Sequence, residues 1–300
     1  MPHDIPGAPG RPDTPDRPER HRDSNAAPIA DAVLGRVQEP YQRRLDRPDT
    51  PGGDTPRHAV RGFDPERAGL GPLSADAAEQ HVTASGGDRP WLDHARYVGP
   101  DTRRVLAALD RGGGHALERH GSTVTPERTA ARVTRLEDPA VHLDTGRTPG
   151  RDAYKSGTHA CGDNATRITD PHAFAACFVR GIEHPAVRQE LDRPCRIGGP
   201  PARPIEIPLS DLLGPQGYAY CDGHRLDPVG GSSAAARDCR AAWVDAIRND
   251  RAPDAPEPTA TRLEKEDFRN AKVVFAFRPN QSRSAWEVAT MYVDPVKREP

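Results

Sequence analysis

Two alternating segments near the carboxyl end constrain the fold of this chain more than any other feature. Lys272–Phe277 and Trp286–Val293 are rich in β-branched and aromatic residues, and the polar segment Arg278–Ser284 separates them. Alternation with a period of two is typical of strands that bury one face and expose the other. The pattern therefore predicts an antiparallel hairpin, and with it a sheet at the carboxyl end of the chain.

Helical patterns come before this hairpin. Ser74, Thr125 and Asp170 are capping residues that each precede a helix-forming segment, and a proline follows both Thr125 and Asp170 at the first helical position. Asp101–Asp110 places its apolar residues on one face. Helices followed by strands predict an α+β fold, with N-terminal helices leading into a small antiparallel sheet.

The middle of the chain gives weaker signals. Ala165–Thr169 reads as a short strand, and the segment from Cys195 to Pro258 is rich in glycine and proline. Within that segment the pattern predicts a strand at Ile205–Ile207 and a helix around Ala236–Ile247.

The first part of the chain has a different composition. Arg11–Pro15 recurs as Arg47–Pro51, in a chain with 33 prolines and only 35% apolar residues. Proline restricts the residue before it and removes a backbone donor, so such repeats favour extended, hydrated chain. We therefore expect a disordered leader or linker over residues 1–65, a helical lead-in over 66–110 and the folded domain over 111–300.

Several functional classes find no support in the composition. No apolar run approaches the roughly 18–20 residues of a transmembrane helix, and the amino terminus lacks the regions of a signal peptide. We expect a protein without a membrane segment, and any export must use a specialised route or a delivery partner. The net charge of −2 predicts no polyanion partner for the chain as a whole, although a local groove can still be basic.

Five cysteines occur, and none forms a CxxC pair, which argues against a structural zinc site of the usual spacing. An odd number of cysteines without a signal peptide is read first as free, partly buried thiols. One or two disulfides formed after export are the alternative.

A glycine-rich stretch, Arg111–His120, carries the first candidate site residues. Three glycines end the preceding helix and allow close backbone approach to another group. His115 and His120 follow, five residues apart. On a helix this spacing turns the second side chain by about 140° from the first, so the two cannot share one metal ion as i, i+4 histidines do. The stretch is either a general base delivered by a glycine hinge or an ordinary helix boundary.

The second strand of the predicted hairpin carries two hydroxyl groups. Thr290 and Tyr292 are two residues apart, so strand geometry places them on the same face, and Trp286 and Val288 are expected to share it. This hydroxyl pair is either a half-exposed polar face or a hydrogen-bonding platform beside a cleft.

Taken together, these patterns resemble a known family. The string Gly113–His120, a following helix with Arg132, and a terminal strand with Thr290 and Tyr292 look like the bacterial RNase A-like toxin domain. That domain is found at the carboxyl ends of contact-dependent growth inhibition (CdiA-type) and other polymorphic toxins. The resemblance covers roughly residues 115–295 and is anchored mainly at its two ends.

The resemblance implies a set of site residues. The catalytic histidine of the family falls on His120, its arginine on Arg132, and its strand threonine and tyrosine on Thr290 and Tyr292. One extra residue in the connection leaves Arg128 and Arg135 as alternatives for the arginine. Gly121 departs from the family pattern, as does the sequence after Tyr292, and the segment from Cys195 to Pro258 is long for the family.

The chemistry of RNA cleavage asks for these residue types. A histidine of ordinary pKa near 6.5 suits removal of the ribose 2′-OH proton. A guanidinium matches phosphate oxygens, and Thr290 and Tyr292 could bond the phosphate or a base. His115 and Tyr292 are both candidates for the general acid, and His115 is also a candidate substrate-binding residue. The expected activity is a metal-independent endoribonuclease without a cofactor, forming a 2′,3′-cyclic phosphate.

The toxin interpretation implies two partners, an RNA substrate such as tRNA and a cognate immunity protein, with secretion or delivery to a neighbouring cell. Two other functions remain open. The first is a non-catalytic secreted interaction module, which a separation of more than about 10 Å between His120 and the pair Thr290 and Tyr292 would favour. The second is an ADP-ribosyltransferase toxin, for which the sequence holds no convincing Arg…Ser-x-Ser…Glu-x-Glu pattern.

Overall fold

The computed structural model describes residues 60, 62–85, 89–112, 114–140, 161–195, 201–280 and 285–296. All of them belong to one compact unit, Pro56–Pro300. The predicted disordered segment over residues 1–65 lies almost wholly outside the described residues. Its boundary at 65/66 falls inside the compact unit, where Val60 and Phe63 are buried.

The helices before the predicted domain pack against it. They are α2 (Ala75–Ala84), the 3-10 helix η2 (Pro90–Tyr97) and α3 (Pro100–Arg111). Phe63 meets Phe178 edge to face, and the hydroxyl of Thr102 lies 3.0 Å from Nδ1 of His172, so contacts reach the later helix α6 (Pro171–Glu183). The expected lead-in over residues 66–110 is therefore part of the same unit as residues 111–296.

The predicted capping residues begin their helices as expected. The hydroxyl of Thr125 accepts from the N–H of Arg128 at the start of α5 (Pro126–Arg135), and Asp170 accepts from Ala173 at the start of α6 (Pro171–Glu183). Ser74 caps α2 in the same way. The remaining helical elements are α4 (Ala116–His120), α7 (Pro185–Leu191), α8 (Leu209–Leu213), α9 (Ser233–Arg248) and the 3-10 turns η4 (Gly217–Tyr220) and η5 (Lys265–Phe268).

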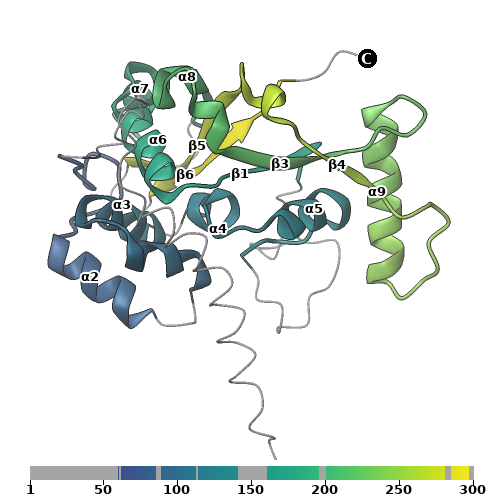
Figure 1. Ribbon diagram of the computed structural model, residues 1–300, viewed down its shortest axis with the longest axis horizontal. Coiled ribbons are helices and arrows are strands. Elements are labelled where there is room, and N and C mark those ends of the chain that lie inside the picture. The colour runs from purple at the N-terminus through teal and green to yellow at the C-terminus, as the bar shows by residue number, and fades with distance from the viewer. Residues whose placement is uncertain are drawn as a thin grey trace, which may run out of the picture. The chain divides into compact units, whose positions relative to one another are not determined.

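One antiparallel sheet is built from β1 (Asn164–Ile168), β3 (Cys221–Leu226) and β4 (Ala260–Arg262), in the order β1-β3-β4. Figure 1 shows α4 and α5 on one side of this sheet, with α9 beyond β4. A cluster of buried residues joins these elements: Val133, Cys161, Ala165, Leu226 and Ala236. The sequence did not predict β3, which is the central strand and comes from the glycine- and proline-rich middle.

The second antiparallel sheet has the order β2-β5-β6, with β2 (Ile205–Pro208), β5 (Lys272–Asn280) and β6 (Ala285–Asp294). The predicted hairpin is confirmed as β5 and β6, and β5 continues three residues into the expected loop. The register shifts at one point, where Ala276 faces Thr290 and Phe277 faces Val288. Ala289 is thus an extra residue in β6. Such a bulge breaks strict alternation. The period-two expectation that Trp286 and Val288 share the face of Thr290 and Tyr292 therefore does not apply across it.

The two sheets meet where β1 lies beside β6. The hydroxyl of Thr166 in β1 donates to the backbone carbonyl of Val293 in β6. Helix α4 contacts both strands at this junction. Helices combined with small antiparallel sheets confirm the predicted α+β class.

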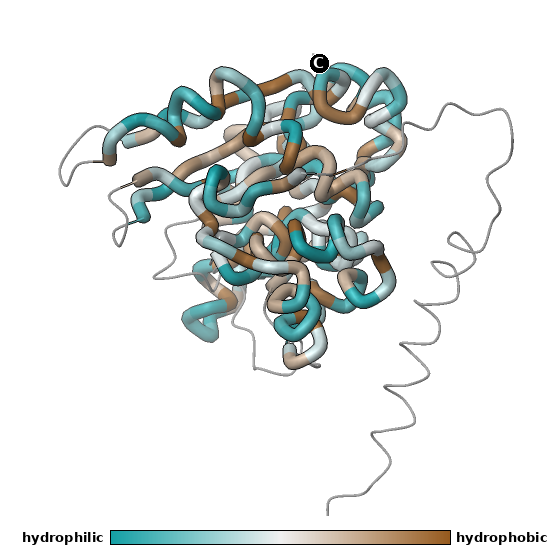
Figure 2. The backbone as a smooth tube through the Cα atoms, turned by 90° about the vertical axis from the view of Figure 1, so that its left-hand side faces the viewer, coloured by the Kyte–Doolittle hydropathy of each residue, from teal (hydrophilic) through white to brown (hydrophobic). Residues whose placement is uncertain are grey.

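Apolar residues are distributed in short stretches over helices and strands alike, as the hydropathy colouring of Figure 2 shows. Among the described residues, no helix has both the length and the apolar character needed to cross a membrane. All five cysteines are free thiols.

Candidate active site

The glycine-rich stretch docks the start of α4 onto the bulge in β6. The backbone N–H of His115 donates to the carbonyl of Ala289 at 2.9 Å. A Cβ atom at Gly114 would lie 2.8 Å from that same carbonyl oxygen and 3.1 Å from that of Val288. Only glycine allows so close an approach, and this explains why a glycine precedes the histidine.

His120, the last residue of α4, is buried and lies against the edge of β1. Its Nδ1 is 2.9 Å from the backbone carbonyl of Thr166. A carbonyl oxygen can only accept, so Nδ1 must carry the proton of this bond. In the neutral ring the lone pair is therefore on Nε2, the nitrogen that could accept a proton from a substrate.

Arg132 of α5 approaches that second nitrogen. Its Nη1 is 3.4 Å from Nε2 of His120, and both residues are buried. Burial, and then the positive charge of Arg132, lower the pKa of His120 well below its ordinary value of 6.5. The other two arginines that the family pattern allowed lie elsewhere, since Arg128 donates to the carbonyl of Pro139 and Arg135 pairs with Glu257.

Tyr292 of β6 completes the surroundings of the imidazole. Its ring stacks on that of His120, with 5.4 Å between the ring centroids and 29° between the planes. Burial, helped by the negative charges of Asp294 and Glu206, raises the pKa of the phenol, so Tyr292 keeps its proton at neutral pH. For Tyr292, one of the two residues in the criterion, the separation is well below the 10 Å that would have favoured a non-catalytic role.

Thr290 lies two residues before Tyr292 on the same strand, beyond the bulge. Its side chain is almost fully buried, with 8% of the residue exposed, and its Oγ1 has no hydrogen-bond partner among the described residues. Leaving a buried hydroxyl unsatisfied costs about 1–3 kcal/mol. A ligand oxygen within reach of this hydroxyl would satisfy it.

His115 is buried at the start of α4, and its positive form would lower the pKa of His120, so the two rings are within electrostatic reach. The sequence-predicted residues His115, His120, Arg132 and Tyr292 thus come together from α4, α5 and β6. No three His, Cys, Asp or Glu side chains gather as a metal site within the described ranges.

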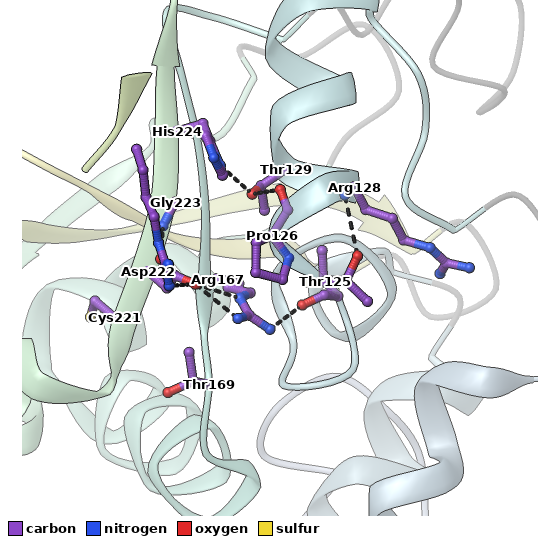
Figure 3. Close-up of polar contacts among 12 residues, drawn as sticks. Thr125, Pro126, Arg128, Thr129, Arg167, Thr169, Cys221, Asp222, Gly223 and His224 are labelled. Atoms are coloured by element: carbon purple, nitrogen blue, oxygen red, sulfur yellow. Dashed lines mark hydrogen bonds and ion pairs between the residues drawn. The ribbon is translucent and has the colours of Figure 1, made fainter. Parts of the chain in front are cut away.

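Sequence reasoning missed a second polar cluster beside this site. On β1, Arg167 donates through Nε and Nη2 to Oδ2 of Asp222 on β3, at 3.2 and 2.8 Å. Arg262 of β4 donates to both oxygens of the same carboxylate. Burial alone would raise the pKa of Asp222, but the hydrogen bonds from Arg262 and Arg167 outweigh it and lower the pKa. Figure 3 shows Arg167 and Asp222 between β3 and the first turn of α5.

His224, two residues after Asp222, holds α5 at a second point. Its Nδ1 is 2.8 Å from Oγ1 of Thr129, and that hydroxyl itself donates to the carbonyl of Pro126. The hydroxyl has one proton, so His224 must donate from Nδ1. The one sequence signal for this cluster is the alternation of Asp222 and His224. The glycine and arginine around them obscured the strand pattern.

Comparison of the chain with protein-family models, with curated proteins and with solved structures found no match.

Proposed function

We propose that this protein is a metal-independent ribonuclease that cleaves RNA by attack of the ribose 2′-OH, leaving a 2′,3′-cyclic phosphate. The observation that carries the proposal is the meeting of His120 with Arg132 and Tyr292, which lie on three different elements up to 172 residues apart in the sequence. A buried neutral imidazole, a guanidinium and a phenol side by side are a set of groups that suits phosphodiester transesterification.

His120 is the general base. The bond from its Nδ1 to the carbonyl of Thr166 fixes the tautomer, and its lowered pKa keeps Nε2 deprotonated at neutral pH. The base can therefore accept the proton of the 2′-OH as the oxygen attacks phosphorus. Because the nucleophile belongs to the substrate, this step needs no metal-bound water.

Arg132 binds the phosphate. In the free protein its guanidinium lies against Nε2 of His120. A phosphodiester offers a better, charged acceptor, so the guanidinium turns to the non-bridging oxygens and uncovers Nε2. Charge neutralisation then raises the pKa of His120 in the complex, which makes it a stronger base when substrate is present.

Thr290 and one proton donor complete the reaction. The hydroxyl of Thr290 donates to a phosphate oxygen, which satisfies a group that has no partner in the described part of the free protein. The leaving 5′ oxygen needs a proton, and Tyr292 and His115 are the two side chains near His120 that can supply one. Tyr292 can also stack on a base.

The biological setting follows from the resemblance to toxin domains. A ribonuclease of this class, delivered to a neighbouring bacterial cell, would stop growth by cutting RNA such as tRNA. A producing cell would then need an immunity protein that covers the site.

An RNA cleavage assay tests the proposal. The full chain is incubated with tRNA and bulk RNA in EDTA, beside His120→Ala and the matched control His184→Ala, whose histidine caps α7. We expect cleavage by the wild type and by His184→Ala, a loss of about 100- to 10,000-fold in His120→Ala, and no cleavage of DNA. Intact RNA with the wild type, or equal cleavage by His120→Ala, would refute it.

A further inference from the structure

The geometry of the proposed site depends on a short connection. His120 ends α4 and Arg132 lies in α5, and only Gly121–Thr125 joins the two helices. Within that connection the N–H of Val124 donates to the carbonyl of Gly121 at 3.2 Å. Whatever holds the connection against the sheet also sets the position of Arg132 relative to His120.

Arg167 holds this connection directly. Its Nη1 donates to the carbonyl of Val124, while its Nε and Nη2 donate to Asp222. The side chains of Arg167 and Asp222 are 14% and 5% exposed, so the contact is largely shielded from water. Arg167 also directly follows Thr166, whose carbonyl accepts from His120. Two consecutive residues of β1 therefore hold the end of α4 and the turn that leads into α5.

A second contact fixes the rotation of α5. His224 donates to Thr129, which lies three residues before Arg132 and so on the same face of the helix. Arg262 adds a further guanidinium to Asp222, but its side chain is 63% exposed. The shielded contact is thus the pair Arg167 and Asp222, with Arg262 at its solvent-facing side.

We propose that Arg167 and Asp222 are positioning residues that set the distance between His120 and Arg132. This inference rests on the ribonuclease function proposed above. Neither residue touches the imidazole, and both act by holding the connection between α4 and α5. A displacement of about 1 Å between a base and a phosphate-binding group can cost about 100-fold in rate, so a fixed connection matters to the reaction.

The forked shape of arginine is essential to this role. A guanidinium can donate to a carboxylate and to a backbone carbonyl in fixed directions at the same time. The single ammonium of a lysine in the same place would reach Asp222 or Val124, but would not hold both. Arg167→Lys therefore keeps the charge and releases the connection.

Kinetics of the full chain provide the first test. In Arg167→Lys and Asp222→Asn we expect kcat on a short RNA to fall about 10- to 100-fold, with KM changed less than about threefold. Arg262→Ala should have a smaller effect. Arg180→Lys is the matched control, because Arg180 also donates to a backbone carbonyl, that of Leu212, away from the site. It should leave kcat unchanged.

The titration of His120, followed by NMR in the free protein, provides a readout that needs no enzymatic activity. The charged or titratable groups around His120 are Arg132 of α5, Tyr292 of β6, and His115 and Arg119 of α4. Among these groups, Arg132 lies on the helix whose position is set by the connection Gly121–Thr125. We expect the pKa of His120 to rise in Arg167→Lys and Asp222→Asn and to stay unchanged in Arg180→Lys.

The outcomes separate the two proposals. If RNA stays intact with the wild type but the pKa of His120 shifts as expected, the ribonuclease function is wrong and the positioning role stands. An unchanged pKa of His120 in folded Arg167→Lys and Asp222→Asn would overturn the positioning role. Loss of cooperative unfolding in both variants would also overturn it, because the network would then hold the whole domain together.

Discussion

Arg119 and His120 are neighbours in α4, yet their surroundings are opposite. Arg119 is 1% exposed and donates through Nε and Nη2 to both oxygens of Asp138, at 3.1 and 2.6 Å. That carboxylate also accepts from the N–H of Ala140. His120, by contrast, has one firm hydrogen bond at Nδ1 and a long contact of 3.4 Å between Nε2 and Arg132.

The difference distinguishes a structural residue, Arg119, from a proposed functional residue, His120, on one short helix. A buried ion pair with its hydrogen bonds satisfied offers nothing to a ligand, and it holds α4 to the chain after α5. Nε2 of His120, by contrast, has only a long contact with Arg132, and the buried hydroxyl of Thr290 on β6 has no partner among the described residues, so the proposed substrate would satisfy both groups. Arg119 and His120 are both buried, so burial alone does not distinguish the structural ion pair from the proposed catalytic base.

Breaking the ion pair of Arg119 and Asp138 should have the largest effect on stability. Asp138→Ala leaves a buried guanidinium without its carboxylate, so we expect the free energy of unfolding to fall by about 3–5 kcal/mol in a urea titration. Asp245→Ala breaks an exposed pair with Arg251 and should cost less than about 1 kcal/mol. Equal effects in the two variants would show that the buried pair is not a structural anchor.

The activity that depends on His120 should respond to pH instead. The pKa of His120 is lowered first by burial and then by Arg132, so the proposed base stays deprotonated in mildly acidic solution. We expect kcat/KM to keep its value down to well below pH 6.5. Arg132→Gln removes a positive charge, which eases protonation, so its residual activity should fall off at a higher pH than that of the wild type. A wild-type fall-off at or above pH 6.5 would contradict this description of the site.

Thr290→Val should change stability and activity in opposite directions. Valine has nearly the same shape, and it removes a buried hydroxyl for which the described residues offer no partner. We expect a gain of about 1 kcal/mol in unfolding free energy and a loss of about tenfold or more in kcat/KM. Thr129→Val is the control, because it removes a hydroxyl with two hydrogen bonds and should destabilise. Destabilisation by Thr290→Val would show that its hydroxyl is satisfied.

Glu118 directly precedes Arg119 in α4, and its replacement should have the smallest effect on stability. Burial, and then the charges of Asp110 and Asp138, raise its pKa to about 7. The folded protein therefore favours the protonated form, and the resulting stability is lost as the pH rises from about 4.5 through 7. Glu118→Gln should be more stable than the wild type by about 1 kcal/mol at pH 8 and equal to it at pH 4.5.

The sequence predicted the fold where local signals act alone. Capping residues such as Thr125 and Asp170 begin helices because their side chains bond the free N–H groups of the first turn. The hairpin of β5 and β6 follows from its alternation. Strand β3 was not predictable in this way, because Asp222 and Gly223 are poor strand formers. Asp222 is stabilised there by Arg167 and Arg262, which come from other strands.

The site was predictable only as a set of residues. The resemblance named His120, Arg132 and Tyr292, and their contacts in the folded chain agree with that grouping. It could not indicate the role of Thr166, which acts through its backbone carbonyl, so its side chain leaves no signal in the sequence. The bulge at Ala289 was also hidden, since one extra residue changes the register without changing the composition.

The chemical ends of the RNA products show whether His120 acts as the base. A defined short RNA is cleaved by the full chain in EDTA, and the new termini are identified by mass spectrometry. We predict a 2′,3′-cyclic phosphate and a 5′-hydroxyl with the wild type, and neither product with His120→Ala under the same conditions. Products that carry a 5′-phosphate, or identical products from both proteins, would contradict the assignment of His120 as the base.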